Sequence, residues 1–257
     1  MIVNINNSIT DNRAIICYDK KKGVASATSE VDMFPASAPN NELTYSYWQP
    51  ASLPATWTLT FSQNEVIDYF AIANHTLVGC TVTLQQGNNW TEIGHTEVIT
   101  DRRPIILKFN QITTNKVRIV ITGVPLGLAL VGVVFCGKAL LMQREIYGGH
   151  SPITMSRITT KRTNESERGQ WLGTSIVREG LESDFSWDNL EAEWVRENFD
   201  PFILHARTKP FFIAWRPLKF PNETAYCYAP TDIHPDNMGR KDFMSVKISV
   251  KGLGYDE

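Results

Sequence analysis

The chain has 257 residues, of which 42% are hydrophobic and 20% charged, which is the composition of an ordinary globular protein. Its formal net charge of -2 removes the electrostatic basis for general nucleic-acid binding, so we expect no nucleic-acid partner. Basic residues cluster locally at Lys20-Lys21-Lys22 and at Arg102-Arg103. We interpret both clusters as solvated turns rather than binding patches.

The cysteines and the apolar runs indicate in which compartment the protein is made and whether it enters a membrane. The four cysteines are widely spaced and form no Cys-x-x-Cys pair, which indicates reduced thiols rather than a zinc or redox site: Cys17, Cys80, Cys136 and Cys227. The N-terminus lacks the basic and apolar regions of a signal peptide. The longest apolar stretch, 124–136, contains Pro125 and glycines and is too short to span a bilayer. We therefore expect synthesis in a cytoplasm and no membrane insertion.

Residues up to about 150 indicate short strands separated by turns. Apolar residues alternate or run together in segments of strand length, and Gly, Asn, Asp and Pro divide them. The expected strands are 57–61, 67–73, 81–85, 90–93, 105–109 and 116–121. No helix of ordinary length has a convincing pattern here. Strands at this spacing predict a β-sandwich or barrel.

The next part of the chain contains the expected domain boundary. Two glycines and a proline interrupt the pattern at 147–152, so we predict one domain over residues 1–146 and a second over 147–257. Residues 153–159 are strand-like. The polar run 161–169 has the composition of an exposed hairpin tip or loop.

One helix is expected in the second domain. Asp188 is a good N-cap and Glu191 stands three positions later, which is the capping-box arrangement. Asp200-Pro201 repeats the start signal, because proline is favoured at the first helical position. Strands flank this helix on both sides, including the apolar run 210–217. The pattern predicts an α+β domain of antiparallel strands with one helical element.

The sequence shows no set of residues that would carry catalysis. The histidines have no metal-ligand spacing, and His234-Pro235-Asp236 is better explained as a turn than as a base with its carboxylate. Glu179, Glu182 and Asp184 offer carboxylates, but a glycosidase needs two of them fixed across a cleft. We therefore expect no catalytic residues, no metal and no cofactor, and a protein that is not an enzyme.

Aromatic residues are the stronger feature, with seven tryptophans in the chain. Trp57 and Trp215 lie in strand-like runs and are expected in the core. Trp48 and Trp90 lie beside turns, where an exposed ring could stack on a sugar. These two are the candidate glycan-stacking residues, although packing remains the favoured role for both.

The segment from about Ala14 to Leu141 resembles a galactose-binding-like, discoidin-type β-sandwich. The phrases that carry the resemblance are Tyr47-Trp48, Trp57-Thr58-Leu59-Thr60-Phe61, Val66-Ile67-Asp68-Tyr69-Phe70-Ala71-Ile72, Trp90-Thr91-Glu92-Ile93, Val117-Arg118-Ile119-Val120-Ile121 and Val131-Gly132-Val133-Val134-Phe135. The resemblance implies an eight-stranded jelly-roll whose loops at one end often bind glycans. Such domains also serve as spacer modules.

The segment from about Ile153 to Leu253 is similar to distal tail proteins of long-tailed bacteriophages. The similar phrases are 169–180, Asn198-Phe199-Asp200-Pro201-Phe202, 210–217 and 237–246. This resemblance implies a homo-oligomeric ring, commonly of six copies, that joins the tail tube to the hub and tail-fibre proteins. We assign the ring-forming role to residues 147–257, although some members place the ring domain first and the sandwich comes first here.

Three hypotheses about function follow. The leading one is a structural virion protein of the tail tip, located in the phage tail and made in the host bacterial cytoplasm. The second is a glycan-binding adhesion module that attaches the particle to a host surface. The third is an accessory domain of a polysaccharide-cleaving enzyme, which ranks last because no carboxylate pair stands out.

Overall fold

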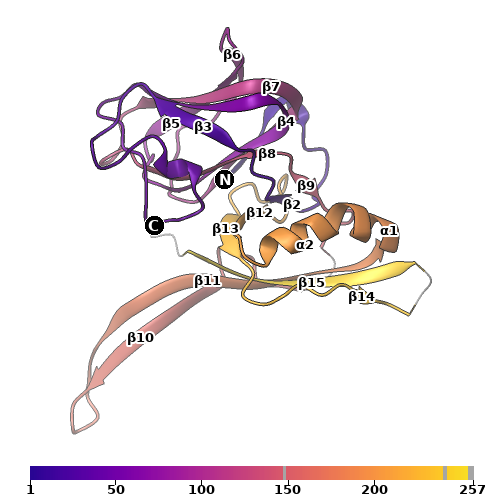
Figure 1. The fold of residues 1–257 in the computed structure, drawn as a ribbon. Coiled ribbons are helices and arrows are strands. Elements are labelled where there is room, and N and C mark those ends of the chain that lie inside the picture. The colour runs from indigo at the N-terminus through magenta and orange to yellow at the C-terminus, as the bar shows by residue number, and fades with distance from the viewer. Residues whose placement is uncertain (147–148, 240–241, 254–257) are drawn as a thin grey trace.

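Two mainly antiparallel sheets and one helical element make up the computed structural model, which describes residues 1–146, 149–239 and 242–253 (Figure 1). The first sheet has the strand order β3-β4-β7-β5-β6, with β1 pairing in parallel with β7 and β8 pairing with β4. Its strands are β1 (Ile2–Asn4), β3 (Gly23–Ala27), β4 (Ala55–His75), β5 (Cys80–Gln86), β6 (Thr91–His95), β7 (Ile105–Gly123) and β8 (Val131–Gly137).

The first sheet folds over itself because two of its strands are very long. The segments expected as separate strands at 57–61 and 67–73 are the two halves of β4, and β7 likewise unites 105–109 with 116–121. The exposed polar residues 62–64 lie between the halves of β4, where its pairing with β7 slips in register. Trp57 and Phe70, one from each half, meet edge to face with ring centroids 6.3 Å apart. The predicted β-sandwich is therefore confirmed.

The sandwich encloses its own apolar core. Trp57 is fully buried and its indole Nε1 donates a hydrogen bond to the carbonyl oxygen of Ala36 at 2.7 Å. Cys80 and Cys136 belong to the same cluster as small core residues, as expected. The only described helices before residue 150 are the single-turn η1 (Ile5–Asn7) and η2 (Ala38–Asn40), in agreement with the sequence pattern.

The second sheet combines strands from both ends of the chain. Its order is β10-β11-β15-β13-β12-β2-β9, with β14 on β15. The strands are β2 (Ile15–Cys17), β9 (Leu140–Leu141), β10 (Arg157–Glu165), β11 (Trp171–Glu191), β12 (Phe211–Ala214), β13 (Thr224–Tyr228), β14 (Asp236–Asn237) and β15 (Phe243–Leu253). Because β2 and β9 precede residue 146, the first part of the chain completes the sheet of the second part. The division at residue 146 remains a prediction.

Strand β12 lies between two cores. Phe211 and Ile213 point into the cluster that also holds the helix, while Phe212 and Ala214 point into a cluster shared with the sandwich. The ring of Phe212 meets that of Phe135 with centroids 5.3 Å apart. A strand covered on both faces needs a continuous apolar run, which explains the sequence of this segment.

The helical element starts later than the sequence predicts. Strand β11 continues to Glu191, and the helix then runs as α1 (Ala192–Trp194), a π-helical turn η3 (Val195–Phe199) and α2 (Asp200–Ala206). Asn189 takes a left-handed conformation with φ of 58°, and the buried Leu190 beyond it pairs with Met244 of β15. Burial of Leu190 in the sheet therefore wins over the capping box at Asp188. One helical element on an antiparallel sheet is confirmed.

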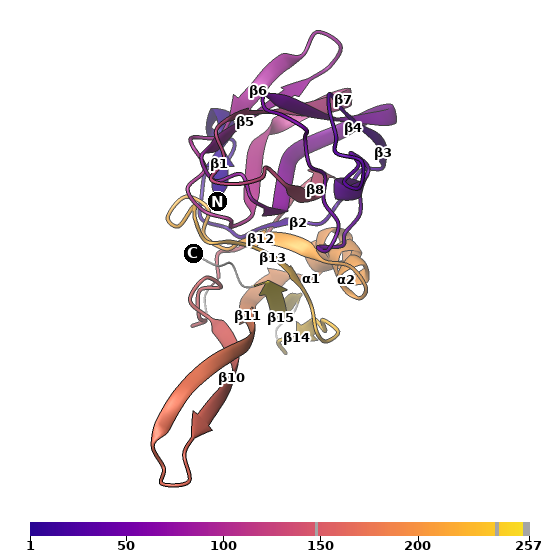
Figure 2. The ribbon, with the colours of Figure 1, turned by 90° about the vertical axis from the view of Figure 1, so that its left-hand side faces the viewer.

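Strand β10 and the first half of β11 form a two-stranded hairpin that projects away from the rest of the molecule (Figures 1 and 2). We call residues 157–179 the arm. Its turn lies at 166–170, where Gly169 has a φ of +73°, so the predicted hairpin tip is confirmed. The apolar cluster that also holds the helix is called the second core. The strand expected at 153–159 begins only at Arg157, because Ile153 is buried in this second core. Among the described residues, no helix has the length and hydropathy needed to cross a membrane.

Candidate functional site

Trp48 is placed in the sandwich core. Its side chain is 0% exposed, and its indole Nε1 donates to the carbonyl oxygen of Ser29 at 3.0 Å. Its backbone bridges to Val131 of β8. With no free face, the ring cannot stack on a sugar in this structure. The expectation of an exposed ring is not met, and the packing role favoured by the sequence accounts for this residue.

Trp90 lies at the turn between β5 and β6 and is partly buried. The guanidinium carbon of Arg118 lies 4.0 Å from its ring centroid, and the ammonium nitrogen of Lys116 lies 5.2 Å away. A second contact fixes Arg118, whose Nε donates to Gln85 at 2.7 Å. These cations use ring surface that a sugar would need. Trp90 stays a predicted stacking residue, with a competing intramolecular partner.

Two of the three carboxylates considered for glycosidase chemistry form ion pairs between neighbouring strands. Glu182 lies 3.6 Å from the ammonium of Lys251, and Asp184 lies 2.8 Å from that of Lys247. Hydrogen bonds from Lys247 and Ser249 lower the pKa of Asp184. A general acid requires the opposite shift, a raised pKa. The described residues contain no group of three or more His, Cys, Asp or Glu that could hold a metal ion.

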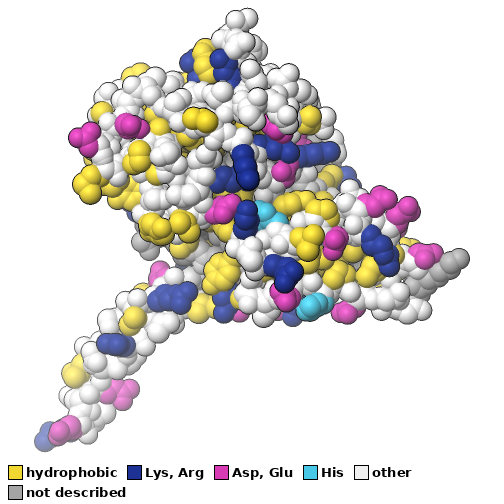
Figure 3. Space-filling model, viewed as in Figure 1, with side chains coloured by type: hydrophobic (Ala, Val, Ile, Leu, Met, Phe, Trp, Pro, Cys, Tyr) yellow, Lys and Arg dark blue, Asp and Glu magenta, His cyan; other side chains and the backbone are white. Residues whose placement is uncertain are grey.

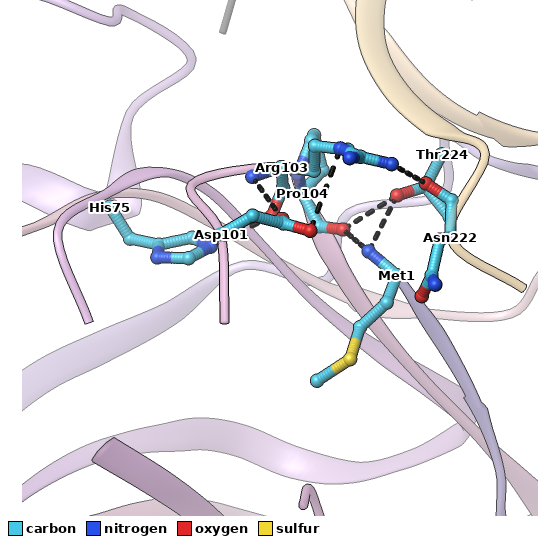
Figure 4. Close-up of polar contacts among 7 residues, drawn as sticks. All are labelled: Met1, His75, Asp101, Arg103, Pro104, Asn222 and Thr224. Carbon is cyan, nitrogen blue, oxygen red and sulfur yellow. Dashed lines mark hydrogen bonds and ion pairs between the residues drawn. The ribbon is translucent and has the colours of Figure 1, made fainter. Parts of the chain in front are cut away.

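A partly buried polar cluster joins the two halves of the chain around Pro104 (Figure 4). The hydroxyl of Thr224 donates to the carbonyl oxygen of Pro104 at 2.6 Å and accepts from the Met1 amino group at 2.8 Å. Arg103 donates to the carbonyl oxygen of Asn222 at 3.3 Å. Met1 at the start of the chain, Thr224 of β13 and the loop before β7 thus meet in one network.

His75 lies beside this network and is hydrogen-bonded to it through Arg103. The backbone N–H of Leu77 donates to its Nδ1 at 3.3 Å, so its Nε2 carries the proton and donates to the carbonyl oxygen of Arg103 at 2.8 Å. Burial lowers the pKa of His75 to about 4, which keeps the ring neutral near pH 7. Both ring nitrogens of His75 are therefore already hydrogen-bonded within the protein.

The arm carries exposed apolar side chains that no part of the described chain covers. Trp171 is 69% exposed, and the others are Ile158, Leu172, Ile176 and Val177. The register pairs Lys161 with Ile176 and Glu165 with Trp171, so Trp171 and Ile176 lie on the same face. Figure 3 shows hydrophobic side chains interspersed with charged ones along the arm. Apart from the polar run at the tip, no sequence pattern predicted this exposure.

A groove of about 610 Å³ lies at the root of the arm. One wall is the arm itself, and the others are the loop 42–45, the segment 206–210 and the ends of β13 and β15. Tyr45 and Tyr228 line it with exposed rings, and Arg178, Glu182 and Lys251 add charged groups. Exposed aromatic rings beside polar groups are the usual composition of a ligand groove. No sequence pattern indicates this groove, because its walls come from segments that lie far apart in the chain.

Comparison with known proteins finds likeness only among solved structures. No protein-family model and no curated protein matches the chain. A CpGH89CBM32-5 structure from Clostridium perfringens, in complex with GalNAc-β-1,3-galactose, aligns at 20% identity over 44% of this chain and 94% of its own, with a TM-score of 0.40. The family 32 carbohydrate-binding module of C. perfringens NanJ, in complex with galactose, aligns at 19% identity over 48% and 98%, also at 0.40.

A pectin-binding carbohydrate-binding module aligns at 13% identity over 46% of this chain and 91% of its own, with a TM-score of 0.40. These alignments cover less than half of the chain at low similarity. The fold is therefore established by the strand pairing of this protein and not by these alignments.

Proposed function

We propose that this protein is a structural, non-catalytic subunit of a phage tail tip, which assembles into a homo-oligomeric ring through its arm. The observation that carries the proposal is the exposure of the arm on both faces and along both edges. Apart from their shared ladder, β10 and residues 171–179 of β11 pair with no other described strand. A two-stranded hairpin of this kind is at best marginally stable in water.

A neighbouring copy is the partner that this geometry favours. The free strand edges of the arm present unpaired backbone N–H and C=O groups, which readily pair with another chain. An arm that reaches from one copy to a different surface of the next makes a head-to-tail contact, and such contacts form a ring when the rotation between copies closes. The resemblance of residues 153–253 to distal tail proteins supports a ring of about six copies that contacts the tail tube, hub and tail-fibre proteins.

The mass of the purified protein tests the assembly directly. We expect a ring for the natural sequence and a monomer for Ile176→Asp, because a charge on the apolar face of the arm would be buried unpaired in the contact. Val98→Asp is the matched control, since Val98 of the sandwich is 58% exposed and Ile176 is 56% exposed. A natural protein that stays monomeric, or equal behaviour of the two variants, would contradict the proposal.

The location in the tail needs a separate experiment. Electron microscopy of particles that carry a labelled copy should place the label at the distal end of the tail. A label found elsewhere on the virion, or absent from it, would refute the tail-tip role even if the protein forms rings.

Glycan binding is the second candidate, favoured by the exposed rings of Tyr45 and Tyr228 in the groove at the arm root. A sugar could stack on these rings and bond to the charged groups beside them. Binding to a glycan array should be lost in Tyr45→Ala and Tyr228→Ala if this groove is used. Loss in Trp90→Ala instead would place the site on the sandwich, and no binding at all would leave the assembly role alone.

A further inference from the structure

The three consecutive lysines, interpreted from the sequence as a solvated turn, line a cleft. The cleft, of about 570 Å³, lies between the segment 18–23 at the edge of the sandwich and the helix α2. Pro201, His205 and Lys209 form its far wall, and Glu42 and Asn40 border it. Figure 3 shows Lys or Arg, Asp or Glu and His side chains together where the sandwich meets the helix-bearing half.

Positive charge dominates this cleft although the chain as a whole is slightly acidic. Four lysines line it against two carboxylates: Lys20, Lys21, Lys22 and Lys209 against Asp19 and Glu42. Lys21 lies 3.1 Å from Asp19, and Lys209 lies 3.6 Å from Glu42. No described carboxylate lies within 4 Å of Lys20 or Lys22. Two cations therefore remain without an ion-pair partner among the described residues.

Lys20 is held in the cleft by contacts that do not neutralise its charge. Its ammonium donates to the carbonyl oxygen of Asn41 at 3.0 Å and lies 4.8 Å from the ring centroid of Phe135. Burial lowers the pKa of Lys20 to about 8; Glu42 opposes this shift, and the like charge of Lys209 adds to it. A desolvated cation kept beside another cation in a cleft costs free energy and is typical of functional sites.

We propose that this cleft binds an oxyanion, the phosphate or carboxylate group of a small ligand, with Lys20 and Lys22 as its cationic contacts. Lysine recognises phosphate and carboxylate as a compact point charge without demanding a fixed geometry. The volume of the cleft lies in the range of small-molecule sites and accommodates a sugar phosphate or a sugar acid. This inference goes beyond the proposed assembly role and does not depend on it.

Calorimetric titration at low ionic strength tests the proposal, with inorganic phosphate, galacturonate and neutral galactose as three separate probes. We expect saturable binding of at least one anion, no binding of galactose in this cleft, and weaker binding as salt is added. Tighter binding of phosphate would indicate a phosphorylated ligand as the source. Tighter binding of galacturonate would indicate a sugar acid.

Substitutions localise the binding. Lys20→Gln and Lys22→Gln should each weaken it about tenfold, the loss of one charge-assisted contact. Lys22 is exposed, so its replacement leaves folding intact even if Lys20→Gln does not. Lys247→Gln, an exposed lysine of β15 paired with Asp184, is the control that should bind as the natural protein does. Absence of saturable anion binding, or equal effects of Lys22→Gln and Lys247→Gln, would overturn the proposal.

Discussion

The two halves of strand β11 pair with different strands and lie in different environments: the outer half pairs with β10 and the inner half with β15. In the inner half, every second residue is buried against the second core, as in Leu181, Ser183, Phe185 and Trp187. In the outer half, residues 171–179 are almost all exposed, including Trp171 and Ile176. The strand therefore starts in solvent and ends in a core, and its pairing partner changes from β10 to β15 near Gly180.

This difference separates two reasons for an apolar side chain in a strand. Phe185 is apolar because one face of the inner half covers a core, and the period of two follows from that face. No described residue covers the outer half, so folding of a single copy does not account for Trp171 or Ile176. A contact outside the chain would account for their chemistry, and the proposed ring rests on this argument.

The largest expected effect compares the two halves directly. Phe185→Ala should destabilise the protein by about 3–5 kcal/mol, because it opens a cavity in a packed core. Ile176→Ala should change the free energy of unfolding of the monomer by less than about 0.5 kcal/mol, because the side chain is exposed. Urea unfolding followed by circular dichroism measures both. Similar losses would mean that the arm is packed in the free protein.

A lower pH should destabilise the part of the protein outside the arm and leave the arm unaffected. The pKa of His75 is lowered from 6.5 to about 4, so the unfolded chain binds a proton that the folded chain does not. Stability should therefore fall as the pH drops from 6.5 towards 4, by about 1.4 kcal/mol per pH unit and about 3 kcal/mol in all.

His75→Gln should reduce this slope, while the exposed His95→Gln should keep it. The arm contains no histidine, so Ile176→Ala should also show the natural slope. Unfolding curves at a series of pH values measure this slope for each variant. An unchanged slope in His75→Gln would show that another group carries the acid sensitivity.

Hydrogen exchange compares the arm with the sandwich at single backbone amides. Amides of 161–176 should exchange at least tenfold more slowly in the ring than in the Ile176→Asp monomer, a difference of about 1.4 kcal/mol in local opening. Amides in the sandwich strands β4 and β7 should exchange equally in both. Equal rates in the arm would show that the ring contact lies elsewhere.

The smallest effect concerns the exposed ion pair between Lys247 and Asp184 on the inner half. Lys247→Ala should cost less than about 1 kcal/mol, because water and salt screen exposed pairs. The pKa of Asp184 is lowered, so its contribution is present above the usual value of 3.8 and is lost as the pH falls below it. A loss that persists after protonation would point to packing of the lysine stem.

Local pattern predicted some elements well and misplaced others for physical reasons. The strands at 57–61 and 67–73 were correctly assigned as strands, but their union in β4 depends on pairing with β7 at the other end of the sandwich. The helix start at Asp188 was wrong because the burial of Leu190 in the sheet outweighs a local cap. The turn beside Trp48 made sugar stacking an alternative to the favoured packing role, and in the structure the ring lies in the core beside the bridge to Val131.

By itself, the sequence determined what depends on neighbouring residues: a mainly β chain, its strand segments, a single helical element and a polar hairpin tip. Tertiary structure alone decided what depends on distant residues. The sharing of one sheet by β2 and β12, the covering of Phe212 by the sandwich and the grouping of Lys20 with Lys209 are of this kind. Periodicity reports which face of an element is apolar, whereas the surface that covers that face is set by packing between segments far apart in the chain.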